Sequence, residues 1–170
     1  MREGGEYGIF CFMIDVSNYN KIKSDAESYF ASQRPVLCTA INEYVSFGSE
    51  GFNHITFKRH RAERDKSSQM IRFKMLPRAI QLIGRTTTYQ EYEEFLKEFE
   101  VKLLKKRERH IKTVKYWGLI AIIDDRKIKV ILRKIGNGKV HFWSVIPAWV
   151  TNKVRDQKFI STMKGNPIEY

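Results

Sequence analysis

The fold is decided by residues 114–146, which read VKYWGLIAIIDDRKIKVILRKIGNGKVHFWSVI. Three runs rich in β-branched and aromatic residues follow one another there, at 114–123, 127–135 and 140–146, separated by Asp124-Asp125-Arg126 and Gly136-Asn137-Gly138. An Asn-Gly pair between two such runs is a strong signal for a β-hairpin. The pattern therefore predicts a twisted antiparallel meander toward the C-terminal end of the chain.

The register of the last hairpin follows from its turn. If residues 137–138 form a two-residue turn, Arg133 faces Phe142 and Ile131 faces Ser144. Directly opposed residues lie on one face of a sheet, so Arg133 and Ser144 would be diagonal neighbours on the same face. We expect this face to present a cation beside a hydroxyl group.

Helical patterns predominate upstream of the meander. Asp25–Gln33 predicts a short helix, and residues 70–76 lead to Pro77, which fits the first turn of a new helix. Thr88-Tyr-Gln-Glu91 fits a capping box that opens an amphipathic helix. That helix would carry apolar side chains at helical spacing, namely Tyr92, Phe95, Phe99 and Leu103.

Two short runs, Ile9–Val16 and Phe52–Phe57, are interpreted as strands. The prediction is one α+β domain over residues 1–170, in which N-terminal and central helices pack on a C-terminal twisted antiparallel sheet. Within it we expect an N-terminal segment (1–48), a core (49–150) and a C-terminal tail (151–170).

The charge of the chain is unevenly distributed. Lys and Arg number 31 against 19 Asp and Glu, a formal net charge of +12. Residues 1–50 carry a net −3 and residues 51–170 a net +15. Such a concentration of positive charge favours capture of polyanions. A soluble domain whose lysines merely face water is the simpler alternative.

Other classes of protein find little support in the sequence. The two cysteines, Cys11 and Cys38, lack the spacing of a metal site and there is no HExxH motif, so no metal or other cofactor is expected. The longest apolar run, residues 9–14, is too short to span a bilayer, so no membrane partner is expected. We expect a cytoplasmic protein, or one delivered into a target-cell cytoplasm.

The segment FNHITFKRH, residues 52–60, carries the candidate chemistry. Histidine is suited to proton transfer near neutral pH, and adjacent cations suit a phosphate. His54 could therefore act as acid or base, Lys58, Arg59 and Arg133 could stabilise charge, and Ser144 could donate a hydrogen bond to a phosphate oxygen. A histidine that merely packs in the core remains the alternative for His54.

This arrangement resembles the barnase–EndoU–colicin–RelE-like nucleases, and within them the phage- and toxin-associated branch. The resemblance covers about residues 50–150 and rests on His54-Ile-x-x-Lys58/Arg59 followed by Arg133 and Phe142-Trp143-Ser144-Val-Ile-Pro147. It implies a four-stranded antiparallel sheet behind helices and ribonuclease activity, often toxic and often paired with an acidic inhibitor protein. The sheet glutamate that barnase-type members use as base has no counterpart in the meander.

The sequence thus predicts a metal-independent ribonuclease that acts by 2′-hydroxyl transphosphorylation, with RNA as its partner rather than DNA. A noncatalytic basic nucleic-acid-binding domain is the alternative. Further nucleic-acid contacts are expected from the cations and rings nearby, namely His60, Arg61, Arg64, Lys66, Lys134, His141 and Trp143.

Overall fold

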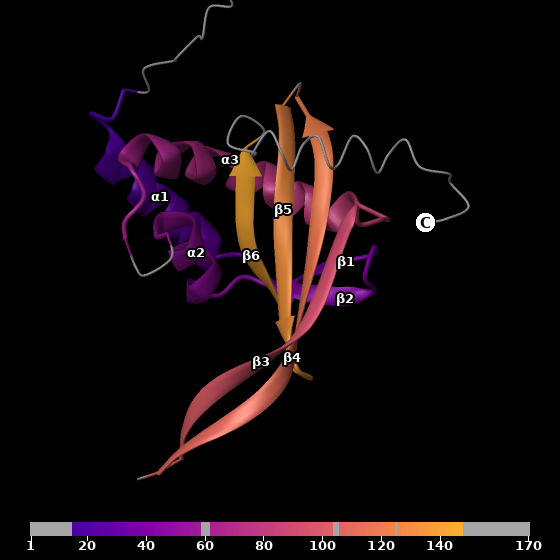
Figure 1. Ribbon diagram of the computed structural model, residues 1–170. Helices are drawn as coiled ribbons and strands as arrows, with labels where there is room; N and C mark the ends of the chain where they lie inside the picture. The colour runs from indigo at the N-terminus through magenta and orange to yellow at the C-terminus, as the bar shows by residue number, and fades with distance from the viewer. Residues whose placement is uncertain (1–14, 59–61, 104–105, 125, 148–170) are drawn as a thin grey trace, which may run out of the picture.

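The computed structural model describes residues 15–58, 62–103, 106–124 and 126–147. In these ranges the chain forms three helices and six strands (Figure 1). The helices are α1 (Tyr19–Ala31), α2 (Ser49–Thr56) and α3 (Lys66–Arg85). The strands are β1 (Val36–Cys38), β2 (Glu43–Ser46), β3 (Glu91–Leu103), β4 (Lys106–Ile123), β5 (Arg126–Ile135) and β6 (Val140–Pro147).

The strands form one open, mixed sheet in the order β1-β2-β6-β5-β4-β3. The predicted meander is present as β4, β5 and β6, which pair antiparallel with their chain neighbours. The sheet is not purely antiparallel and not confined to the C-terminal part of the chain, because β2 pairs with β6 in parallel. The prediction of an α+β fold is confirmed, and its description of the sheet is corrected.

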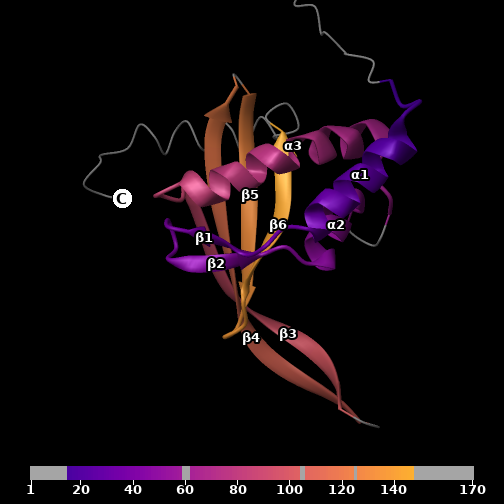
Figure 2. The same cartoon turned by 180° about the vertical axis from the view of Figure 1, so that it is seen from behind.

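The core lies between the sheet and α3, which crosses one face of the sheet (Figures 1 and 2). On the helix, Met70, Phe73 and Leu76 are at most 3% exposed, and on the sheet Leu119 and Leu132 are fully buried. Burial of side chains of this size stabilises a fold by about 1.5–3 kcal/mol each. The sheet face turned away from α3 is the one that carries Arg133.

α3 is a single helix, so the interpretation of Pro77 as the start of a new helix was wrong. The helix begins at Asp65, whose side chain accepts a hydrogen bond from the backbone N–H of Ser68 at 2.7 Å. Pro77 lies in its interior with an exposed ring. An interior proline costs about 3 kcal/mol, which the apolar burial along the rest of α3 outweighs.

The predicted helix after Thr88 is also absent, because residues 91–103 form β3. All thirteen residues of β3 pair with β4, from Glu91 opposite Gly118 to Leu103 opposite Lys106. Tertiary pairing thus overrides a spacing that fits a helix. The part of this hairpin that lies beyond β5, residues 96–103 and 106–113, projects from the rest of the sheet and is called the arm below (Figure 1).

Two further predictions concern the N-terminal half. The predicted helix at 25–33 is present as α1, which begins earlier and ends at Ala31. The predicted strand at 52–57 is wrong, because these residues belong to α2 and its C-cap Phe57. Residues 9–14 of the other predicted strand lie outside the described residues. No helix in the described ranges has the length and apolar character needed to cross a membrane.

Candidate functional site

A cleft of about 620 Å³ opens between α2 and the strands β5 and β6. Charged, polar and aromatic side chains surround it, most of them from α2 and its C-terminal extension. They are Glu50, Asn53, His54, Phe57, Lys58, Arg133 and Trp143. The cleft therefore combines an imidazole, a carboxylate and two cations beside aromatic rings.

α2 divides its side chains between the core and the cleft. Phe52 and Ile55 are buried in the core, whereas Glu50, Asn53 and His54 face the cleft. Residues three and four apart lie on the same face of a helix, which explains why these polar groups converge. A histidine that looks isolated in the sequence is thus one member of a polar helix face.

Gly51 permits α2 to approach β6 closely. A Cβ atom at this position would lie 2.3 Å from the carbonyl oxygen of Phe142, a distance that no real side chain tolerates. The absence of a side chain at Gly51 therefore brings the helix into backbone contact with the strand. This contact places His54 beside the rings of β6.

A β-bulge in β6 aims Trp143 at the cleft. Ile131 pairs with Ser144 and Leu132 with Phe142, so Trp143 is the extra residue. Bulges re-aim side chains and often occur next to functional sites. The predicted pairing of Ile131 with Ser144 is confirmed, but between the bulge and the turn Arg133 faces His141, so the predicted pairing of Arg133 with Phe142 was wrong.

Trp143 joins the histidine to the arginine. The centroid of the Trp143 ring lies 4.2 Å from the centroid of the His54 ring and 3.5 Å from the guanidinium carbon of Arg133. The same guanidinium forms an ion pair with the carboxylate of Glu50. A cation over an indole ring is stabilised by the quadrupole of the ring. Arg133 is therefore held between α2 and the sheet, with 12% of its side chain exposed.

His54 is electrostatically unusual. Burial, together with the positive charges of Arg64, Arg133 and Arg72, lowers its pKa from 6.5 to about 4. Desolvation and nearby cations both disfavour the protonated imidazole. The side chain is therefore neutral near pH 7 and able to accept a proton.

Arg72 and Arg64 form a positively charged layer behind the cleft. Arg72 is 3% exposed, and burial lowers its pKa to about 10. Arg64 donates a hydrogen bond from Nη2 to the carbonyl oxygen of His54 at 3.3 Å. Several buried nitrogens have no hydrogen-bond partner among the described residues, namely His54 Nδ1, Arg64 Nε, Arg72 Nε and Nη1, and Arg133 Nε. The positive charge of Arg64 and Arg72 behind the cleft makes its electrostatic potential more favourable for an anion.

The structure brings together four of the residues predicted from the sequence, His54, Lys58, Arg133 and Trp143. Arg64 lies behind them, and His141 is half-buried opposite Arg133. Three others lie elsewhere: Ser144 is 3% exposed and does not line the cleft, Lys134 pairs with Glu43 at 2.7 Å, and Lys66 lies 5.2 Å from the Tyr19 ring centroid. The predicted Arg59, His60 and Arg61 lie outside the described residues.

Sequence reasoning missed Glu50, Asn53 and Arg72. The spacing of Glu50, Asn53 and His54 would have indicated a polar helix face, had residues 49–56 been read as a helix. Arg72 lies within an apolar helical pattern and carries no signal of its own. Among the described residues, no group of three or more His, Cys, Asp or Glu side chains is placed to hold a metal ion.

Comparison of the chain with protein families, with curated proteins and with solved structures finds no match.

Proposed function

We propose that this protein is a metal-independent ribonuclease that cleaves RNA in the cleft between α2 and β6 by attack of the 2′-hydroxyl group. The observation that carries the proposal is a neutral, partly buried imidazole placed among guanidinium groups and against an indole ring. The net charge of +15 in residues 51–170 supports capture of a polyanion.

Arg133 and Lys58 are the groups proposed to bind the scissile phosphate. Arg133 lines the cleft with a guanidinium that is fixed by Glu50 and Trp143. Lys58 is exposed at the rim and forms no ion pair within the described part of the chain. Preorganised cations of this kind stabilise the extra charge of a phosphorane. Trp143 contacts both His54 and Arg133 and so fixes the imidazole and the guanidinium relative to each other.

His54 is proposed as the general base, because its lowered pKa keeps it neutral at the pH of a cell. It accepts the proton of the 2′-hydroxyl group while the 2′-oxygen forms a bond to phosphorus. The bond from phosphorus to the 5′-oxygen then breaks, and Lys58 donates a proton to that oxygen. The products are a 2′,3′-cyclic phosphate and a 5′-hydroxyl, after which water removes the proton from His54 and restores that of Lys58.

Glu50 has a proposed positioning role. Its carboxylate pairs with Arg133 from the first turn of α2, and its side chain is 73% exposed. A phosphate that enters the cleft competes with this carboxylate for the guanidinium. The ion pair with Glu50 thus holds Arg133 in place when no RNA is bound, and it breaks when the phosphate of RNA binds Arg133.

The test is cleavage of a tRNA pool and of a dinucleotide in EDTA, with analysis of the product ends. We expect cyclic-phosphate ends, and a fall of about 10²- to 10⁴-fold in kcat for His54→Ala, the range that positioned proton transfer supplies. His110→Ala is the matched control for the dinucleotide, because His110 lies on the arm. Equal activity in the two variants would refute the assignment of His54.

Binding without cleavage would favour the second candidate, a noncatalytic RNA-binding domain. The two cations that line the cleft, Lys58 and Arg133, fit this function equally well. In that case His54→Ala would leave RNA affinity nearly unchanged, and affinity would still fall steeply with salt.

A further inference from the structure

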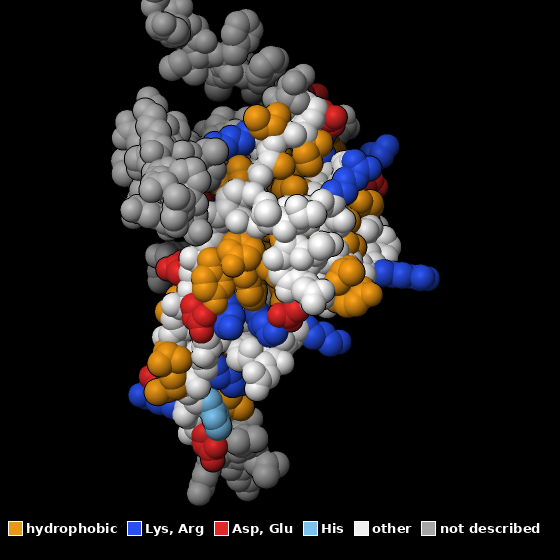
Figure 3. Space-filling view, turned by 90° about the vertical axis from the view of Figure 1, so that its right-hand side faces the viewer, with side chains coloured by type: hydrophobic (Ala, Val, Ile, Leu, Met, Phe, Trp, Pro, Cys, Tyr) orange, Lys and Arg blue, Asp and Glu red, His pale blue; other side chains and the backbone are white. Residues whose placement is uncertain are grey.

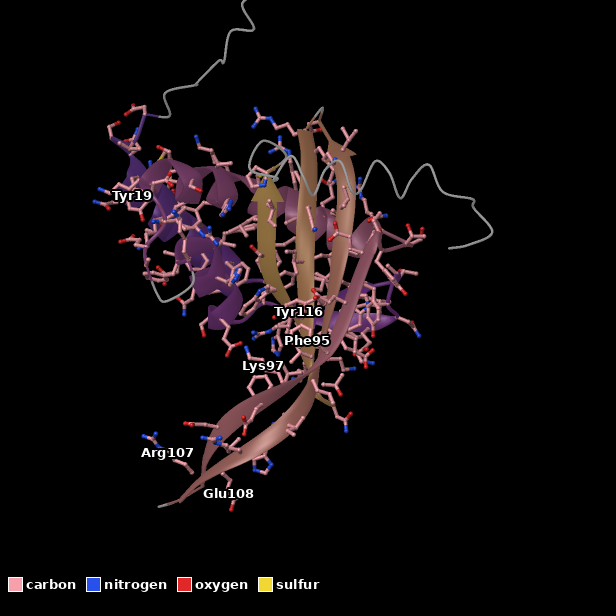
Figure 4. The ribbon with its side chains drawn as sticks, viewed as in Figure 1. Tyr19, Phe95, Lys97, Arg107, Glu108 and Tyr116 are labelled. Atoms are coloured by element: carbon pink, nitrogen blue, oxygen red, sulfur yellow. The ribbon has the colours of Figure 1, made fainter. Side chains whose placement is uncertain are left out.

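The arm shares one continuous face with the cleft. Cross-strand partners lie on the same face of a sheet, and the register aligns Arg133 with Tyr116, Val114 with Phe95, Lys112 with Lys97, and His110 with Phe99. Tyr116, Phe95 and Lys97 follow one another from the body of the protein onto the arm (Figure 4). This face therefore continues from the cleft along the projecting hairpin.

Aromatic rings and cations alternate along that face in close contact. The Tyr116 ring centroid lies 6.5 Å from that of Trp143 and 6.0 Å from that of Phe95, with which Tyr116 is stacked. Lys97 Nζ lies 5.7 Å from the Phe99 ring centroid. We call this set the stripe: Trp143, Arg133, Tyr116, Phe95, Lys97, Lys112 and Phe99.

The two lysines of the stripe lack counter-charges, whereas Arg133 pairs with Glu50. Lys97 and Lys112 are exposed and directly opposed, and like charges in this position destabilise a hairpin. Neither forms an ion pair within the described residues. Two carboxylates on the same face flank the stripe: Glu93 is opposite Tyr116, and Glu108 lies 3.4 Å from His110.

The opposite face of the arm is neutralised. Arg107 pairs with Glu100 at 3.8 Å, Arg109 with Glu98 at 3.6 Å, and Lys115 with Glu94 at 3.8 Å. A side view shows charged side chains of both signs along the arm (Figure 3). The hairpin thus pairs its charges on one face and leaves two lysines unpaired beside aromatic rings on the other. That asymmetry indicates an anionic ligand on the stripe.

The rings of the stripe are accessible to such a ligand. Phe95 is 39% exposed, and Tyr116, Phe99 and Trp143 are half-buried. Exposed rings that alternate with cations suit single-stranded nucleic acid, since the bases stack on the rings and the phosphates lie near the cations. A duplex fits poorly, because its bases are already stacked on one another.

We propose that single-stranded RNA runs from the cleft along the stripe, so that the arm binds the nucleotides on one side of the cleaved bond. This rests on the proposed function and adds its substrate class, an unpaired RNA of several nucleotides. Phe99 lies four positions after Phe95 in β3, which is roughly 14 Å along the strand. The stripe is therefore an extended binding surface that a dinucleotide in the cleft does not reach.

The experiment measures binding and cleavage of a single-stranded RNA of about ten nucleotides, a duplex of the same sequence and a dinucleotide. Phe95→Ala should weaken binding of the single strand by about 5- to 150-fold, the range for loss of one stacked base. Leu96→Ala is its matched control, because Leu96 is 71% exposed on the opposite face of the same strand.

The cationic part of the stripe is tested by Lys97→Glu. This change replaces the opposed lysines with an oppositely charged pair, so the arm keeps its pairing while the net charge of the pair at positions 97 and 112 falls to zero. We expect about tenfold weaker binding of the single strand and a shallower dependence on salt. Lys74→Glu on α3 is the control, since it alters the net charge equally at an exposed position on the helical side of the sheet.

The outcomes separate the stripe from the proposed function. Unchanged dinucleotide cleavage with weaker binding and cleavage of the longer strand supports both. Equal behaviour of stripe and control variants on the longer strand, or equal affinity for the duplex, overturns the stripe and leaves ribonuclease activity standing. Stripe-dependent binding without cleavage of any RNA supports the stripe and refutes the proposed function.

Discussion

Acidification should destabilise this protein through His54, by an amount that follows from its environment. Burial and three nearby guanidinium groups lower its pKa to about 4, against 6.5 in an exposed histidine. Between these two pH values the unfolded chain binds a proton at this site that the folded protein does not. The stabilising contribution is therefore fully present above about pH 6.5 and is lost as the pH falls toward about 4.

The magnitude follows from the same two values. Each pH unit of difference between the folded and unfolded pKa is worth about 1.36 kcal/mol, so the full difference corresponds to at most about 3 kcal/mol. The imidazole is partly exposed at the cleft, and water screens part of this cost. We expect protonation of His54 to lower the free energy of unfolding of the wild type by about 1–3 kcal/mol.

The assay is urea unfolding of wild type and His54→Asn at several values between about pH 7.5 and about pH 4. Asparagine keeps a neutral polar group in the cleft and cannot be protonated. Other groups also titrate in this range, so the measured quantity is the difference between the two proteins at each pH. The free energy of unfolding should fall more steeply in wild type. Parallel curves would show that His54 titrates normally, and the argument that it is a neutral base at pH 7 would fail.

Three further predictions concern the structure that supports the cleft. Gly51→Ala should destabilise the fold by about 1–3 kcal/mol and weaken RNA cleavage, because the new Cβ meets the backbone of β6. Gly48→Ala, with its nearest non-local atom at 4.0 Å, should do neither, as urea unfolding and cleavage assays would show. Pro77→Ala should raise the free energy of urea unfolding by about 1–3 kcal/mol, since it restores a hydrogen-bond donor inside α3. Arg72→Met should also raise it by about 1–3 kcal/mol, because it removes an unpaired buried guanidinium, and NMR titration should show a higher His54 pKa.

The meander could be predicted from the sequence because the signals for its turns lie in adjacent residues. Asn137-Gly138 and the β-prone runs on either side need no distant partner to be recognised. The β3 strand could not be predicted in this way, because Tyr92, Phe95 and Phe99 have the spacing of an amphipathic helix. Its strand conformation follows from thirteen paired residues of β4, which is a tertiary effect.

The candidate site could be predicted in part for a similar reason. His54, Lys58 and Arg133 were found by their chemistry, since an imidazole near cations is visible in any conformation. The position of Trp143 could not be derived, because a one-residue bulge separates the pairing next to the turn from the pairing of the rest of β5 and β6. Arg72 escaped notice because the burial of a guanidinium depends on packing between elements far apart in the chain.

Three of the features that sequence rules failed to foresee lie around one cleft. The bulge interrupts the pairing of β5 with β6, the contact at Gly51 forbids any side chain, and Arg72 is buried without partners for two of its nitrogens. Each of these three features, taken alone, lowers the stability of the fold. Natural proteins retain such local conflicts chiefly where function requires them. Their convergence on His54 is therefore an argument for a functional cleft that is independent of the chemistry of its side chains.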